Sequence, residues 1–153
     1  MKRERVGPPE RARCLVAEGL GTALLLAAVV GSGIMGERLS GGNVGLALLA
    51  NSLATGAALV ALILALGPIS GGHFNPAVTL AEASRRGLPW SEVPGYLLAQ
   101  IAGAFAGVAA AHLMFGEPLF AASTHARSGA AQCFSEFVAT FGLLAVIQGC
   151  GRS

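Results

Sequence analysis

The sequence predicts an all-helical protein that crosses a membrane several times, and two observations support this prediction. Of the 153 residues, 54% are hydrophobic and only 12% are charged, about half the charged fraction of a typical soluble domain. The charges are also unevenly placed, because residues 39–81 and 93–116 contain none, and 14–36 and 128–151 contain one acid each. A helix of about 20 apolar residues crosses the ~30 Å hydrocarbon core. The composition excludes a disordered chain, a cytosolic enzyme and a disulfide-stapled secreted domain.

Four complete spans follow from these stretches, over about 14–36, 45–66, 93–115 and 131–150. We expect Gly67-Pro68 to end the second span. Basic residues then set the orientation, because Lys and Arg concentrate in cytoplasmic segments. With the N-terminus in the cytoplasm, only Arg38 and Arg127 of the ten basic residues lie outside. The inner side then holds Lys2, Arg3, Arg5, Arg11, Arg13, Arg85, Arg86 and Arg152. An integral protein of the plasma (inner) membrane with a basic cytoplasmic segment, residues 1–13, is expected.

Residues 67–84 do not fit a simple pattern of spans and loops. They are uncharged as far as Glu82 and begin with a Gly- and Pro-rich stretch. Asn75-Pro76 is a helix-start signal, and a helix from Pro76 to Arg86 would rise about 16 Å, half the hydrocarbon thickness. We therefore predict a loop that enters the membrane in extended form and returns as a half-helix. The alternative is an ordinary cytoplasmic loop with a short surface helix.

The first and fourth spans share a pattern. Ala17-Glu18 is followed by Thr22, and Ser135-Glu136 is followed by Thr140, at a constant offset of 118 residues. Because the first span runs outward and the fourth runs inward, the repeat is inverted. Inverted repeats are typical of channels and transporters that place a site at mid-membrane.

Three motifs, SGGHFNPAVTL (70–80), AE-x-x-x-T (17–22) and YLLAQIAGA (96–104), resemble the first half of a major intrinsic protein, the aquaporin and aquaglyceroporin family. The resemblance covers about 14–150. It implies an aquaporin-like fold with four transmembrane helices and one re-entrant half-helix, in which 14–115 is the first repeat and 131–150 begins the second. Family members have six spans and two Asn-Pro-Ala motifs. This sequence has one motif and stops after the fourth span, so we expect a truncated product.

The resemblance assigns pore roles to the loop, whose motif is Asn75, Pro76 and Ala77 and whose pore-lining limb is Gly71, Gly72, His73 and Phe74. The Asn75 side-chain oxygen would cap the half-helix and turn the amide N–H toward the pore. The positive end of the half-helix would oppose cations. His73 is interpreted as a structural histidine that bonds loop backbone, in preference to a metal ligand.

Two acids and one threonine complete the candidate site. Glu18 and Glu136 lie within apolar spans, where an ionisable group is costly and each carboxylate needs several donors. By resemblance, Glu136 would hold the loop around 71–74 and Glu18 the equivalent loop of the second half; a proton relay is the alternative. Thr55 lies twenty residues before Asn75, where the family places a filter residue. A small side chain there indicates a wider mouth, although Thr55 facing lipid or another helix is the alternative.

We therefore expect a passive channel for water or small uncharged solutes such as glycerol-like polyols and neutral metalloid hydroxides. As a truncated fragment, the 153-residue form is expected not to conduct as a monomer. An inverted-repeat secondary transporter, a non-conducting membrane fragment and an intramembrane hydrolase using Ser32 and His112 are the alternatives. No enzymatic activity, cofactor or nucleic-acid partner is expected. The three cysteines lack metal or redox spacing, so no metal is expected either. The expected partners are the lipid bilayer, the solutes and, by resemblance, other copies in a tetramer.

Overall fold

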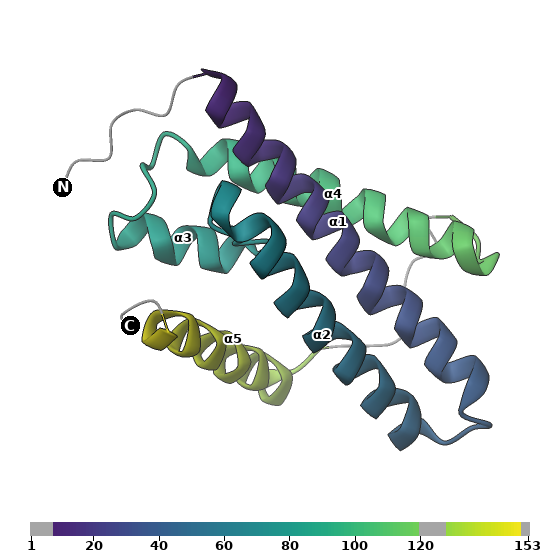
Figure 1. Ribbon diagram of the computed structural model, residues 1–153. Helices are drawn as coiled ribbons and strands as arrows, with labels where there is room; N and C mark the ends of the chain where they lie inside the picture. Colours follow the sequence, from purple (N-terminus) through teal and green to yellow (C-terminus); the bar gives the residue numbers. More distant parts are fainter. Residues whose placement is uncertain (1–7, 120–127, 151–153) are drawn as a thin grey trace. The chain divides into compact units, whose positions relative to one another are not determined.

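The computed structural model describes residues 8–119 and 128–150, which form five α-helices without any strand (Figure 1). The helices are α1 (Pro8–Leu39), α2 (Val44–Ser70), α3 (Pro76–Ser84), α4 (Val93–Phe115) and α5 (Ala130–Cys150). All of these except α3 are long and apolar enough to cross a membrane. The chain divides into two compact units between Phe120 and Ala121, so α1–α4 form the first unit and α5 belongs to the second. The predicted all-helical membrane fold is confirmed.

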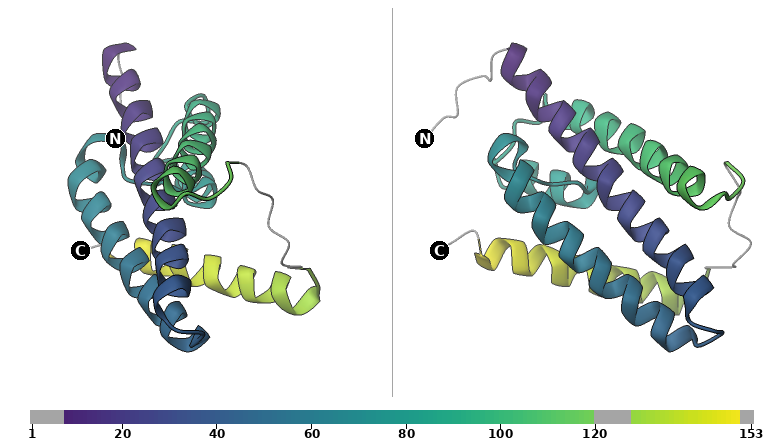
Figure 2. Two further views of the ribbon diagram at one scale, coloured as in Figure 1. Left: turned by 90° about the vertical axis from the view of Figure 1, so that its right-hand side faces the viewer. Right: turned by 45° about the vertical axis from the view of Figure 1, so that its right-hand side comes forward.

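Helix α1 is the central element of the first unit. It packs against α2 on one side and α4 on the other, and the short α3 packs against α4 (Figures 1 and 2). The nine residues of α3 rise only about 14 Å, too little to cross the hydrocarbon core. Helix α3 is therefore a half-helix, as the sequence predicts.

Glycines allow α1 and α4 to approach closely. A Cβ atom added at Gly103 would overlap the Gly19 carbonyl, and one added at Gly107 would overlap the Ala23 carbonyl. Both glycines are buried and lie one helical turn apart on the same face of α4. This is the small-xxx-small packing of membrane helices, in which backbone contact replaces the hydrophobic effect that lipid cannot supply.

Ion pairs join α1 to the two ends of α4. Arg11 Nε lies 2.7 Å from Glu92 Oε2 at the start of α4, and an Arg38 Nη atom lies 2.7 Å from Glu117 Oε1 just after its end. Arg38 also donates to the Phe115 carbonyl at 2.7 Å and lies over the Phe115 ring. Because exposed pairs contribute at most about 1 kcal/mol each, they add little to the α1–α4 contact.

The helix ends differ from the predicted span ends. The prediction that α2 ends at Gly67-Pro68 is wrong, because the helix continues to Ser70. Gly71, with φ of 98°, ends it and donates its N–H to the Gly67 carbonyl at 2.9 Å. Pro68 lacks a backbone N–H, so the helix loses one hydrogen bond close to its end. Helix α1 starts at Pro8, six residues before the expected span at 14. Hydropathy marks the part of a helix inside the membrane core, and the helix itself extends beyond it.

Substituting Gly103 by Ala tests the α1–α4 contact. We expect destabilisation of about 1–3 kcal/mol, because the new methyl group overlaps backbone and forces the helices apart. Thermal unfolding in detergent measures the effect. The matched control is Gly56→Ala, since a Cβ at Gly56 meets nothing within 4 Å and should be neutral or slightly stabilising. Equal unfolding temperatures for the two variants would contradict the close contact.

Candidate functional site

The loop between α2 and α3 has an unusual backbone. Gly71 and Gly72 have φ of 98° and 64°, and Phe74 has φ of 47°, in the left-handed region that side chains disfavour. The Phe74 ring is only 4% exposed and rests against Gly21 of α1, where any Cβ would overlap the ring. Packing of the ring therefore maintains a strained backbone, a feature that often marks functional sites.

Glu18 of α1 holds this loop in place. Its carboxylate is fully buried and accepts four hydrogen bonds. Oε1 accepts from Ser70 Oγ at 2.6 Å and from the His73 N–H at 3.0 Å. Oε2 accepts from the Phe74 N–H at 2.8 Å and from Gln100 Nε2 at 2.8 Å. These donors satisfy the buried acid, which would otherwise be very costly in an apolar environment.

The sequence-based assignment of Glu18 to a loop of the second half is therefore wrong. It rested on family resemblance and on the inverted repeat, which do not show which acid faces which loop. Glu18 lies on the helix that packs between α2 and α4, so the loop after α2 folds back onto it. Glu136 lies on α5, in the second unit. The expectation that Glu136 holds the loop is wrong as well, because the N–H groups of His73 and Phe74 donate to Glu18. Within the described part of its own unit Glu136 is exposed, so its burial stays a prediction.

A second layer of hydrogen bonds supports the first. Thr79 Oγ1 accepts from Gln100 Nε2 at 2.9 Å and lies 3.1 Å from His73 Nδ1. The Tyr96 hydroxyl donates to the Ser70 carbonyl at 2.9 Å, and its ring lies 5.3 Å from the His73 ring, centroid to centroid. The His73 ring is thus held by side chains of α3 and α4, and not by loop backbone as the sequence-based interpretation expected.

The sequence analysis gave no role to Tyr96 and Gln100, although both lie in the motif YLLAQIAGA (96–104). A usable signal was present: an amide in the charge-free stretch 93–116 needs partners, as the two acids do. Which partners it takes depends on α4 lying beside α1. Gln100 contacts both Glu18 and Thr79, so it links the loop, α1 and α3.

Asn75 caps α3 as the sequence predicts. Its backbone is extended, Pro76 occupies the first helical position, and Asn75 Oδ1 accepts from the Ala77 N–H at 2.8 Å. The backbone carbonyl of Asn75 accepts from the Thr79 N–H at 3.0 Å. Since the cap uses Oδ1, the amide nitrogen Nδ2 is left as a donor, and it has no partner within residues 8–119 or 128–150.

The backbone amides of the loop are hydrogen-bonded, whereas its carbonyls are not, among the residues that the structure describes. The N–H groups of His73 and Phe74 donate to Glu18, and the Gly72 N–H donates to Ser70 Oγ at 3.2 Å. None of the carbonyl oxygens of residues 71–74 accepts a hydrogen bond from the described part of the chain. The loop thus offers a series of free acceptors that leads to the free donor of Asn75.

The loop lies within the apolar length of α1. Its Phe74 ring contacts Gly21, which follows Cys14, the start of the stretch 14–36, by seven residues. Seven residues of helix rise about 10 Å, a third of the hydrocarbon core. Irregular backbone at such depth is tolerated only where protein buries it or where it lines a water-filled path. The surface-loop alternative does not fit this depth.

Thr55 is half-buried on α2, and its Oγ1 atom is buried without a partner among the described residues. The exposed part of Thr55 is therefore not its hydroxyl oxygen. Whether Thr55 faces a pore stays a prediction. If it does, the side chain presents a small and mainly apolar surface there.

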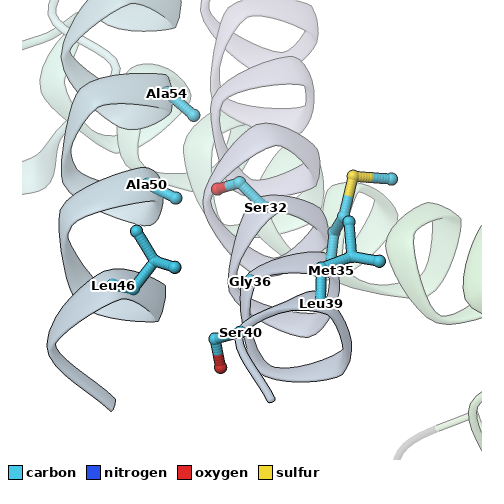
Figure 3. A pocket seen from close by; sticks show the side chains of 8 residues that line it. All are labelled: Ser32, Met35, Gly36, Leu39, Ser40, Leu46, Ala50 and Ala54. Carbon is cyan, nitrogen blue, oxygen red and sulfur yellow. The ribbon is translucent and has the colours of Figure 1, made fainter. Parts of the chain in front are cut away.

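Ser32, the nucleophile of the hydrolase alternative, lies at a pocket of about 380 Å³ between α1 and α2 (Figure 3). Its Oγ atom donates to the Val29 carbonyl at 3.3 Å and accepts from Asn51 Nδ2 at 3.1 Å. His112 Nδ1 is buried and has no partner within the described ranges, so Ser32 and His112 are not hydrogen-bonded to each other. These contacts do not favour a Ser–His pair.

A half-helix capped inside an apolar bundle, with a loop of free carbonyls before it, defines a class of polytopic membrane protein with a re-entrant loop. The family model of the major intrinsic proteins matches residues 7–151. The chain belongs to the major intrinsic protein family, and it is an integral membrane protein.

Relatives support this membership. The chain is 56% identical over 135 residues to aquaglyceroporin AqpS of Rhizobium meliloti (strain 1021), covering 88% of this chain and 57% of that protein. It is 36% identical over 137 residues to aquaporin NIP1-1 of Oryza sativa subsp. japonica, covering 88% of this chain and 47% of that protein. It is 42% identical over 108 residues to aquaglyceroporin-3 of Trypanosoma brucei brucei, covering 70% of this chain and 34% of that protein. The chain thus spans about half the length, or less, of these relatives.

Replacing Glu18 by Gln tests the network. The variant keeps the shape of the side chain but loses one acceptor oxygen, which leaves loop donors unpaired at a cost of about 1–3 kcal/mol each. We expect a lower unfolding temperature and faster amide exchange in residues 71–75, measured by hydrogen exchange with mass spectrometry. Glu136→Gln is the matched control. Faster loop exchange in Glu136→Gln, with none in Glu18→Gln, would restore the original assignment.

Proposed function

We propose that the chain supplies one half of the conducting path of a passive channel for water and small uncharged solutes. The observation that carries the proposal is the orientation of the loop, whose amides bind Glu18 and Ser70 while its carbonyls stay free. A molecule that moves along the loop exchanges its hydrogen bonds with water for bonds to successive carbonyls. It then meets Asn75 Nδ2 as a donor.

The same arrangement disfavours ions. The N-terminus of α3 lies at Asn75, so the positive end of its dipole opposes cations beside the Asn75 donor. The transporter alternative requires an acid free to take up and release protons. Glu18 is engaged by four donors and is suited to a structural role instead.

The solutes are proposed to include glycerol-like polyols and neutral metalloid hydroxides beside water. Two relatives, from Rhizobium and Trypanosoma, are named aquaglyceroporins. Thr55, placed at the filter by resemblance, is far smaller than an aromatic ring. Its hydroxyl oxygen is buried, so the exposed part is suited to carbon-bound hydrogens of a polyol.

The setting of the channel is also proposed. The basic residues favour a plasma (inner) membrane location with a cytoplasmic N-terminus. By family resemblance the channel is a tetramer, with 14–115 and 131–150 as parts of two inverted repeats. The remaining length of the relatives supplies the second half of the path.

The Asn75→Asp variant tests the proposed donor. The chimera for this test joins residues 1–150 to the remaining sequence of the Rhizobium relative. The 153-residue chain alone is measured beside it, and we expect it not to conduct. Asp keeps the capping oxygen and replaces the amide donor by an acceptor, so we expect intact folding but a large loss of water flux. Stopped-flow light scattering on proteoliposomes measures the flux. Unchanged flux in a well-folded chimera would contradict the role of Asn75.

The Thr55→Phe variant of the same chimera tests the filter. A ring at this position narrows the mouth, so glycerol and arsenite flux should fall at least several-fold while water flux is largely kept. Thr55→Val is the matched control, because it keeps the size and removes only a buried hydroxyl. Equal loss of all three fluxes, or none, shows that Thr55 does not determine selectivity.

A further inference from the structure

A groove of about 400 Å³ runs between the N-terminal part of α1 and the C-terminal end of α2. One cation, Arg13, is among the residues that line it. The rest of the lining is apolar and consists of Ala12, Val16, Ala17, Leu20, Leu66 and Ile69. None of the loop residues 71–75 lines the groove, although Ala17 and Ile69 of its lining are the direct neighbours of Glu18 and Ser70.

Arg13 differs from the other arginines of α1. Arg11 pairs with Glu92 and Arg38 pairs with Glu117, whereas Arg13 is exposed and forms no ion pair within the described ranges. Arg13 is also the last charged residue before the apolar stretch 14–36 begins. Its guanidinium group therefore lies at the level of the membrane interface, where lipid phosphates lie.

The apolar lining extends from this level into the membrane. From Arg13 to Leu20 the helix rises about 10 Å, a third of the hydrocarbon core. Val16 and Leu20 are 66% and 50% exposed, so their side chains offer apolar surface along this length. A cation above an apolar groove matches the chemistry of an amphiphile with an anionic head.

The second α1–α2 pocket provides a comparison. It has a similar volume, about 380 Å³, and lies near the opposite end of the same helix pair (Figure 3). Its lining includes Met35, Leu39 and Leu46 with two serines, and no charged residue. Such a pocket accepts an acyl chain without selecting the head group.

We propose that the groove beside Arg13 is a binding site for an anionic phospholipid, with the phosphate on Arg13 and the upper part of one acyl chain along Val16 and Leu20. The site touches the base of the pore loop, because Ala17 and Ile69 precede Glu18 and Ser70, which share a 2.6 Å hydrogen bond. A bound lipid thus stabilises the joint between α1 and α2. The proposal does not depend on channel activity.

Lipid titration of the delipidated chain in detergent tests the site. Native mass spectrometry counts bound phosphatidylglycerol, with phosphatidylcholine of the same acyl chains and glycerol phosphate as separate arms. We expect phosphatidylglycerol to bind at least several-fold more tightly than either and to raise the unfolding temperature. Arg13→Gln should weaken phosphatidylglycerol binding about fivefold, and Val16→Trp should block the groove.

Two control variants separate this site from general attraction to the protein surface. Arg85→Gln removes another exposed cation that does not line the groove, and Met35→Trp fills the other pocket. Both should bind phosphatidylglycerol as the unmodified chain does. Equal binding of the two phospholipids would overturn the proposal, as would equal losses in Arg13→Gln and Arg85→Gln. Occupancy by a second copy of the chain, seen as dimers lost in Val16→Trp without selective lipid binding, would also overturn it.

Discussion

The carboxylate of Glu18 is the interaction on which the rest of the first unit depends. A fully buried acid in an apolar helix must gather donors, and here it takes two from the loop backbone and one each from Ser70 and Gln100. Because the carboxylate accepts only, it draws the N–H groups of the loop toward α1. The carbonyls of residues 71–74 are left without a hydrogen-bond donor in the described part of the chain. A single structural acid thus determines which polar groups of the loop are bonded and which are left free.

The network requires α1, α2 and α4 to lie very close together. Gly103 and Gly107 bring α4 into backbone contact with α1, which places Gln100 within reach of Glu18. Gly21 leaves space on α1 for the Phe74 ring, which in turn holds the left-handed backbone of the loop. Small residues therefore do more than permit packing. They set the distances at which the polar groups can bond.

The periphery of this unit is less tightly constrained. The ion pairs of Arg11 and Arg38 are exposed, and the two pockets between α1 and α2 are lined mainly by apolar side chains. In a bilayer, apolar surfaces of this kind lie against lipid chains.

The sequence by itself determined the number and type of helices, the half-helix after Asn75 and the family. Each of these depends on local signals: charge-free length, a helix cap before proline, and a contiguous motif. The tertiary structure alone decided that Glu18 holds the loop, that Gln100 and Tyr96 support it, and that α2 continues past Pro68 to Gly71. It also decided that the Thr55 hydroxyl is buried. These features depend on which faces of separate helices meet. The sequence shows which residues share a face of one helix, but it does not show which other helix that face will contact.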